Sequence, residues 1–196
     1  MDLHKKINHG FLNLIIGPMF SGKSTRLIHY IRKYKTLNFP MMVIKPSIDT
    51  RYTDSNEICT HNFEKESCIS YGVDDLKLIF NDQHYTSSKI IIIEEGQFFK
   101  SLYDNVKQMT DIDKKIVYVT ALNGDSNREL FGDVYKLLPL CDNIEFMQAL
   151  CIECSDGTFG IYSKRYSEKA IKDQVCVGGS SIYHAVCREH YFEDNI

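Results

Sequence analysis

The sequence predicts an α/β fold, a parallel sheet with helices, followed by a small C-terminal module. Four short apolar runs are continuous rather than alternating, as expected for strands buried on both faces of a parallel sheet. A glycine-rich motif follows the first run and precedes a helical pattern. After residue 150 long apolar runs are lacking, and four of the seven cysteines occur there. We therefore expect two domains, residues 1–149 and residues 150–196.

The elements of the first domain follow from apolar periodicity. Residues 11–16 form an apolar run that Gly17 and Pro18 end, and residues 23–32 carry Leu27, Ile28 and Ile31 at helical spacing. Three further strands are expected at 41–44, 90–93 and 116–119, with helices at 74–80 and 99–109. The segment 51–67 is polar and aperiodic, which predicts a long loop.

The composition is that of a folded globular protein. Of the 196 residues, 43% are hydrophobic and 25% are charged, so a core can form without disulfides. The 23 basic and 26 acidic residues leave a net charge of −3, which disfavours binding of nucleic acid through bulk charge. No apolar stretch approaches the roughly 18 residues that cross a bilayer, so we expect an intracellular protein without a membrane partner.

The glycine-rich motif is a phosphate-binding loop, which makes the first domain a P-loop (RecA-like) nucleotide-binding domain. It satisfies G-x-x-x-x-G-K-[ST] with Gly17, Pro18, Met19, Phe20, Ser21, Gly22, Lys23 and Ser24. Backbone N–H groups at the start of the following helix hold phosphate oxygens, Lys23 reaches the β- and γ-phosphates of ATP, and Ser24 ligates Mg²⁺. The alternative is a glycine-rich turn with a solvated lysine.

Two adjacent carboxylates, Glu94 and Glu95, follow the strand at 90–93. A P-loop requires an acidic partner for its metal at the carboxyl end of a neighbouring strand. Two carboxylates beside a triphosphate favour a division of roles, in which one binds the metal and the other acts as a base. The alternative is that both end the strand in solvent.

The C-terminal module carries two pairs of metal-ligand residues, Cys151 with Cys154 and Cys187 with His190, each with two residues between them. Four such ligands leave no open position for catalysis, so we expect a structural Zn²⁺. His184 is a competing fourth ligand. Unligated buried cysteines and a thioredoxin-like redox pair are weaker alternatives. The remaining cysteines are expected in the core or in loops: Cys59, Cys68, Cys141 and Cys176.

These motifs together resemble the type II thymidine kinases. The resemblance rests on residues 17–25, on Asp49-Thr50-Arg51-Tyr52, on Glu95-Gly96-Gln97-Phe98-Phe99 and on the two zinc pairs. Their order and spacing extend from about Gly10 to Phe192. The short length and the absence of a C-terminal extension look more like the enzymes of large cytoplasmic DNA viruses than those of animals.

The resemblance implies transfer of the γ-phosphate of ATP to the 5′-hydroxyl of thymidine, giving dTMP, with deoxyuridine as a second substrate. Glu95 matches the general base of the family. Relatives usually carry Asp where this chain has Glu94, whose extra methylene moves it from direct to water-mediated contact with Mg²⁺. Asp49 and Arg51 match a loop pair near the metal and phosphates, and Gln97 is assigned to the ATP and phosphate site.

The resemblance also implies a lasso-like loop in the zinc module that binds thymine largely through its backbone groups. By motif matching, this loop and its neighbours comprise Gln174, Val175, Cys176, Val177, Gly178, Tyr183 and Ser163. Met19, Leu122 and Phe131 are expected as apolar walls, although each is also an ordinary core candidate. Ser126 stands where the animal enzymes have phenylalanine, which leaves one wall of the pocket open to question.

Two rival functions remain open at the level of sequence. One is a zinc-ribbon P-loop ATPase that acts on nucleic acid, which the net acidity and the lack of a long basic stretch oppose. The other is a P-loop kinase of another small metabolite. The family resemblance further implies a homotetramer, feedback inhibition by dTTP, no stable nucleic-acid partner and a cytoplasmic location, which is the host cytoplasm for a viral enzyme.

Overall fold

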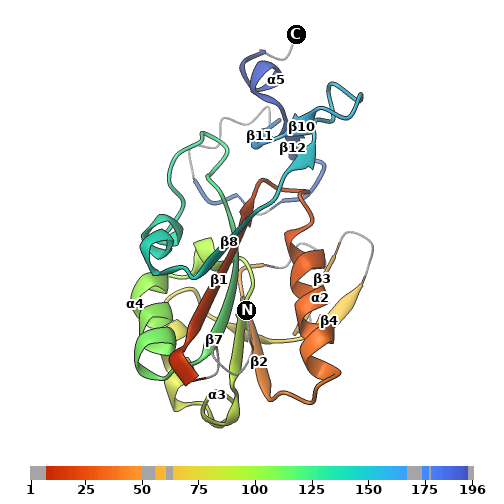
Figure 1. Ribbon diagram of the computed structural model, residues 1–196. Helices are drawn as coiled ribbons and strands as arrows, with labels where there is room; N and C mark the ends of the chain where they lie inside the picture. The colour runs from red at the N-terminus through yellow and green to blue at the C-terminus, as the bar shows by residue number, and fades with distance from the viewer. Residues whose placement is uncertain (1–7, 50–55, 61–63, 167–173, 177, 194–196) are drawn as a thin grey trace.

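The computed structural model describes residues 8–49, 56–60, 64–166, 174–176 and 178–193, and its centre is a six-stranded sheet (Figure 1). Neighbouring strands pair in parallel throughout, in the order β5-β2-β6-β7-β1-β8. Their bounds are β1 (Phe11–Gly17), β2 (Met41–Pro46), β5 (Ile69–Tyr71), β6 (Ile90–Ile93), β7 (Ile116–Leu122) and β8 (Asn143–Phe146). The predicted α/β class is therefore confirmed.

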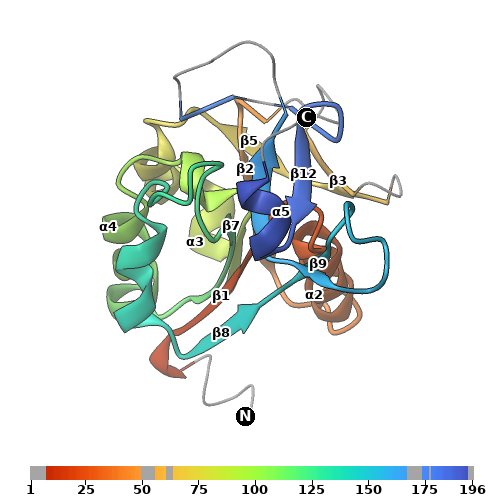
Figure 2. The same ribbon diagram turned by 90° about the horizontal axis from the view of Figure 1, so that it is seen from above.

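Helices cover both faces of this sheet. In Figure 2, α2 (Lys23–Lys35) lies on one side of the strands, and α3 (Gln83–Ser87) and α4 (Leu102–Lys107) lie on the other. Shorter helical turns are η1 (Leu76–Asn81), η2 (Gly96–Phe98), η3 (Gln108–Ile112) and η4 (Val134–Leu140). The helix predicted at 74–80 is thus a 3-10 turn, and the one predicted at 99–109 begins at Leu102 and ends in a π-helical turn.

The strand β7 explains why the apolar runs are continuous. Its residues Ile116 and Tyr118 pack in the core under α2, whereas Val117 and Val119 pack in the core under α4. Successive side chains of a strand point to opposite faces, so a strand covered on both sides needs apolar residues at every position.

The long loop predicted at 51–67 is wrong in part, because this segment contains an antiparallel hairpin. It pairs β3 (Glu57–Cys59) with β4 (Lys65–Ser67), and residues 50–55 and 61–63 lie outside the described part of the chain. Ile58 is fully buried against the core under α2, while Glu64 and Glu66 pair with Arg32 of that helix. Two three-residue strands with charged outer faces are too short to show an apolar period.

Two further strands were missed, β5 and β8. Both lie at the edges of the sheet, where one side of the strand has no neighbour. In β8, Ile144 and Phe146 remain exposed, so the strand lacks the buried apolar run by which the inner strands are recognised.

The C-terminal module lies beyond the carboxyl ends of the sheet strands (Figure 1). It contains β9 (Ala149–Leu150) paired with β10 (Phe159–Gly160), β11 (Tyr162–Arg165) paired with β12 (Tyr183–Val186), and α5 (Arg188–Phe192). The backbone N–H of Met19 donates to Oγ of Ser163 at 2.9 Å, which joins the phosphate loop to this module. The division into domains 1–149 and 150–196 stays a prediction.

None of the helices in the described part of the chain is both long enough and apolar enough to span a lipid bilayer.

Candidate active site

The phosphate loop connects β1 to α2 at the carboxyl edge of the sheet. A Cβ atom on Gly17 would lie 2.3 Å from the carbonyl oxygen of Met147, so only glycine fits there. Gly22 precedes the helix with φ of 84°, a conformation that glycine adopts without strain. No side chain caps this helix N-terminus, so its first N–H groups face the position where phosphate oxygens bind in P-loops.

Lys23 is buried within this loop. Its Nζ donates to the carbonyl oxygen of Pro18 at 2.7 Å, and Oγ of Ser21 donates to the same oxygen at 2.8 Å. A buried ammonium that rests on a backbone carbonyl is positioned to exchange this contact for phosphate oxygens. Ser24 lies in the first turn of α2 and is half-buried, so its hydroxyl is near the same end of the helix.

Glu94 and Glu95 follow β6, and they are 4% and 6% exposed. The alternative that both end the strand in solvent is therefore wrong. The N–H of Glu94 donates to the carbonyl oxygen of Ile44 at 2.8 Å, on β2. The N–H of Glu95 donates to Oγ1 of Thr120 at 3.2 Å, on β7. The backbone thus ties the two residues to strands on opposite sides of β6.

Gln97 connects Glu95 to the end of β7. Its Nε2 donates to Oε2 of Glu95, and its Oε1 accepts from the N–H of Leu122 at 3.2 Å. The assignment of Gln97 to the ATP and phosphate site stays a prediction. The structure places Gln97 beside Glu95, in the wall of the neighbouring pocket.

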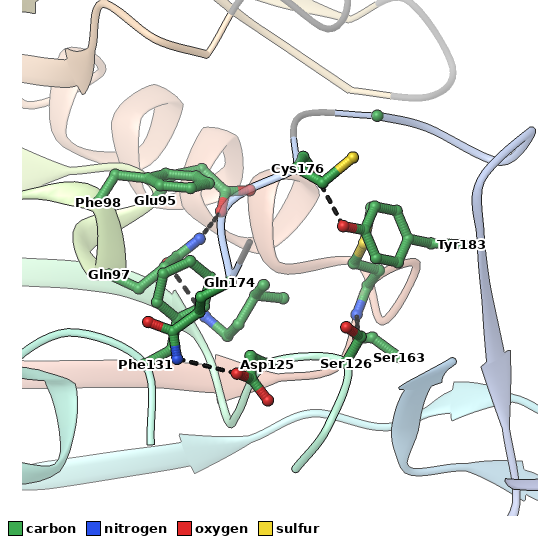
Figure 3. Close-up of a pocket in the computed structure, with 13 residues that line it drawn as sticks. Glu95, Gln97, Phe98, Asp125, Ser126, Phe131, Ser163, Gln174, Cys176 and Tyr183 are labelled. Carbon is green, nitrogen blue, oxygen red and sulfur yellow. Dashed lines mark hydrogen bonds between the residues drawn. The ribbon is translucent and has the colours of Figure 1, made fainter. Parts of the chain in front are cut away.

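A pocket lies between the phosphate loop and the C-terminal module (Figure 3). The lining residues are Met19, Glu95, Gln97, Phe98, Leu122, Asp125, Ser126, Phe131, Ser163, Gln174, Cys176, Gly178 and Tyr183.

Most residues assigned to the nucleoside from the sequence lie in this lining. Val175 does not line it and is 41% exposed, and Val177 lies outside the described residues. Sequence reasoning missed Phe98 and Asp125. Phe98 is part of the quoted Glu95–Phe99 motif and packs edge-on against Phe131 at 5.4 Å, whereas nothing in the local sequence indicates Asp125.

The pocket wall contributed by the C-terminal module is tied to β12. The hydroxyl of Tyr183 donates to the carbonyl oxygen of Cys176 at 2.8 Å.

Asp49 follows β2 at the carboxyl edge, where its N–H donates to the carbonyl oxygen of Pro46 at 3.0 Å. Arg51, its expected companion, lies outside the described residues.

Burial, against the lowering effect of Lys45 and together with the charges of Glu94, Glu57 and Asp49, raises the pKa of Cys68 to about 12. Cys68 and Cys59 are both buried, as expected for core cysteines.

The Cys₃His set is assembled as predicted. The ligand atoms of Cys151, Cys154, Cys187 and His190 all lie within 4.8 Å of one another. Sγ of Cys154 and Sγ of Cys187 are 3.8 Å apart, and Nδ1 of His190 is 3.2 Å from Sγ of Cys187. A tetrahedron with zinc–sulfur bonds of about 2.3 Å has sulfur–sulfur edges of about 3.8 Å, so the donor set fits a structural Zn²⁺.

His184, the competing fourth ligand, faces elsewhere. Its Nδ1 lies 3.4 Å from Oε1 of Glu153, and its ring stacks on Tyr166 at 4.5 Å. All seven cysteines are free thiols rather than disulfides, which agrees with a metal cluster. The geometry therefore favours His190.

Comparisons with known proteins agree with the geometry of the site. The sequence profile of the family described as Thymidine kinase matches residues 10–191. The thymidine kinase of fowlpox virus (strain NVSL) is 36% identical over 193 residues, which cover 96% of this chain and 100% of that protein. The sheeppox virus (strain KS-1) thymidine kinase is 37% identical over 191 residues, 95% of this chain and 99% of that protein. Human cytosolic thymidine kinase is 33% identical over 186 residues, 94% of this chain and 74% of the human protein.

These matches extend over nearly the whole chain, so they include both the phosphate loop and the Cys₃His module. A match confined to the phosphate loop would show only a nucleotide-binding fold. The chain therefore belongs to the thymidine kinase family, whose members are ATP-dependent phosphotransferases.

Proposed function

We propose that this protein transfers the γ-phosphate of ATP to the 5′-hydroxyl of thymidine, with Glu95 as the general base. One observation carries this proposal: the buried carboxylate of Glu95 lines the same pocket as Met19 of the phosphate loop and Gly178 of the C-terminal module. A hydroxyl bound in this pocket would lie between a base and the phosphates held by the loop.

Thymidine is bound between the two modules. Gln174, Cys176 and Gly178 line the pocket and would contact the thymine ring through their backbone groups, and Phe98 and Phe131 form an aromatic wall. Deoxyuridine differs from thymidine only by a methyl group on the base. A pocket that reads the base through backbone hydrogen bonds accepts both, with a preference of roughly tenfold for the methylated base.

The chemical step requires a proton acceptor and charge compensation. Glu95 accepts the proton of the 5′-hydroxyl, and its carboxylate is held in place by Gln97. Lys23 neutralises charge on the transferred phosphoryl group, a role that we also assign to Arg51 from the family resemblance. Ser24 and Glu94 would hold Mg²⁺, which neutralises phosphate charge when it is bound.

A structural Zn²⁺ on the Cys₃His set serves the nucleoside loop rather than the chemistry. The loop residues 174–178 lie between the ligands Cys154 and Cys187 in the sequence. Closing the ends of a long segment limits the conformations that it samples. The metal therefore supports the site that binds thymidine.

The decisive experiment measures ADP formation from Mg-ATP with each nucleoside in turn and with single-stranded DNA. Stimulation by thymidine and deoxyuridine, and not by DNA, supports the kinase. Stimulation by DNA alone would favour the zinc-ribbon ATPase, and stimulation by a different nucleoside or metabolite would favour a kinase of another specificity.

Further properties of this enzyme are part of the same proposal. It forms a homotetramer in the cytoplasm of a host infected by a large DNA virus, and dTTP inhibits it by occupying the thymidine pocket with its phosphates directed to the donor site. The poxvirus relatives support the viral source, and the name of the human relative supports the location. The net charge of −3 supports the absence of a nucleic-acid partner.

A further inference from the structure

The loop between β7 and η4, residues 123–131, contacts the C-terminal module at several points, and we call it the bridging loop. From these contacts we propose that Asp125 and Gln174 form a latch that positions the thymidine-binding loop. Both are positioning residues, because their side chains act on the backbone of the loops and not on the reacting atoms. The inference rests on the proposed function, since it assumes that residues 174–178 bind the nucleoside.

Asp125 uses its two carboxylate oxygens for two different tasks. Its Oδ1 accepts from the N–H groups of Asn127 at 2.8 Å and Glu129 at 2.9 Å, which fixes the turn of the bridging loop. Its Oδ2 accepts from Nε2 of Gln174 at 2.8 Å. Asp125 is 7% exposed whereas Gln174 is exposed, so these charge-assisted hydrogen bonds are partly buried.

Gln174 directs its amide group entirely to the bridging loop. Besides the bond to Asp125 (Figure 3), Nε2 donates to the carbonyl oxygen of Leu130 at 3.0 Å, so both amide hydrogens are used. Two residues later, the carbonyl oxygen of Cys176 accepts from the hydroxyl of Tyr183. The segment 174–176 is therefore held at both ends. At its start, the two side-chain bonds of Gln174 add to a long contact of 3.5 Å from Nη2 of Arg165 to the carbonyl oxygen of Gln174.

A loop that reads a base through backbone N–H and C=O groups must be placed to within about half an ångström. Gln174, Cys176 and Gly178 line the pocket together with Asp125. Loss of the latch leaves the loop attached through Tyr183 but widens the range of positions at its start. We therefore expect weaker thymidine binding without a change in the chemical step.

The docking of the zinc module does not depend on this latch. The guanidinium of Arg128 lies 4.4 Å from the ring centre of Tyr191 and 4.6 Å from that of Phe192. The hydroxyl of Tyr191 also donates to the carbonyl oxygen of Ser126 at 2.8 Å. These contacts anchor α5 to the bridging loop independently, so a latch variant keeps the module in place.

The test begins with Gln174→Leu, which keeps the size of the side chain and removes the donor. We expect KM for thymidine to rise about tenfold, the effect of losing a hydrogen bond to a charged group. The kcat, KM for ATP and zinc content should stay within about twofold of wild type, since nothing else at the site is altered. Asn127→Ala is the matched control, because the exposed Asn127 contributes its backbone N–H to the turn.

Two further variants exchange the donor and the acceptor of the hydrogen bond between Gln174 and Asp125. They distinguish the loss of this one bond from a general loosening of the loop. Gln174→Glu places a second carboxylate against Asp125 and should raise KM for thymidine more than Gln174→Leu does. Adding Asp125→Asn supplies an amide that donates to Glu at position 174, while its Oδ1 still accepts from Asn127 and Glu129. We expect this double variant to recover to within about threefold of the wild-type KM, the remainder reflecting the lost bond to Leu130.

Three kinetic results would overturn the latch: an unchanged KM for thymidine in Gln174→Leu, an equal rise of KM for ATP, or no recovery in the double variant. Amide hydrogen exchange of the nucleoside-free protein tests the latch by a measurement that does not depend on enzyme activity. Exchange at 174–176 should accelerate in Gln174→Leu and return in the double variant. If the wild type fails to phosphorylate thymidine while exchange follows this pattern, the proposed function is wrong and the latch stands. If exchange is unaltered, the latch is wrong.

Discussion

At the scale of single residues, Glu95 has an unusual backbone. Its φ of 51° and ψ of 46° lie in the left-handed region, which costs a non-glycine residue about 1 kcal/mol or more. The bonds to Thr120 and Gln97 hold this conformation. Because Glu94 is bonded toward β2 and Glu95 toward β7, adjacent residues are available for different roles in one site.

The role of Glu95 is tested by Glu95→Gln. The variant should keep its fold and ATP binding but lose about two to four orders of magnitude in kcat, because an amide cannot accept the proton of the 5′-hydroxyl. Steady-state turnover at saturating thymidine measures this, with ATP binding as the control. Turnover close to that of wild type would remove Glu95 from the role of base.

Lys23 provides a second test, on the phosphate side. Lys23→Met should abolish phosphoryl transfer, because its ammonium is the cation nearest to the phosphates in a P-loop. Thymidine binding should persist, since Lys23 bonds to Pro18 within the phosphate loop and does not line the nucleoside pocket. Equilibrium binding of thymidine to the variant checks this. A fully active variant would contradict the assignment of the phosphate loop.

At the scale of elements, Glu145 on the edge strand β8 connects this strand to β1 and to α2. It accepts from Nδ2 of Asn13 on β1 at 2.7 Å, from Nε of Arg26 on α2 at 2.6 Å and from the hydroxyl of Tyr30 at 2.6 Å. The edge strand β8, whose outward apolar residues are exposed, is thus attached to the sheet partly through one carboxylate.

This attachment predicts a pH dependence of stability. Burial raises the pKa of Glu145, but the hydrogen bonds from Tyr30, Asn13 and Arg26 outweigh it and lower the pKa below its ordinary value. A depressed carboxyl pKa contributes stability that is present above the unfolded value of about 4.3 and is lost as the pH falls through the folded value.

Glu145→Gln should therefore lower the free energy of unfolding at pH 7 by about 1 kcal/mol, with a smaller difference from wild type below pH of about 4. Urea denaturation at both pH values measures this. Glu64→Gln is the matched control, because it alters an exposed ion pair with Arg32 that contributes little. A difference that is the same at both pH values would contradict the role of the carboxylate charge.

At the scale of the whole molecule, the pocket is assembled from segments far apart in the sequence. The phosphate loop, the end of β6, the bridging loop and residues 174–178 meet above the carboxyl edge of the sheet (Figure 2). Three of these segments follow the sheet strands β1, β6 and β7, and one belongs to the C-terminal module. The relative position of the two modules therefore determines the shape of the site.

The zinc cluster is expected to act at this scale. Cys151→Ser, Cys187→Ser or prolonged chelation should raise KM for thymidine more than it weakens ATP binding, because the cluster restrains the nucleoside loop and not the phosphate loop. Metal analysis should find about one zinc per chain, as four ligands form one tetrahedral site. Protein that lacks zinc yet binds thymidine normally would contradict both the ligand set and its supporting role.

The inner sheet strands and α2 were predictable because each leaves a local signal. A continuous apolar run identifies β1, β2, β6 and β7, and helical spacing identifies α2. The hairpin at β3 and β4 and the edge strands β5 and β8 have no such signal, because they are short and only partly covered. Their pairing follows from the docking of neighbouring elements.

The sequence by itself determined the chemistry available at the site: a phosphate loop, paired carboxylates and a Cys₃His set, each a motif whose spacing encodes its function. Only the tertiary structure decided that Gln97 bonds to Glu95 and Leu122, and that Asp125 bonds to Gln174. The physical reason is the distance along the sequence between the residues that interact. Motifs are set by neighbouring residues, whereas Asp125 and Gln174 are 49 positions apart and meet only because the two modules dock against each other.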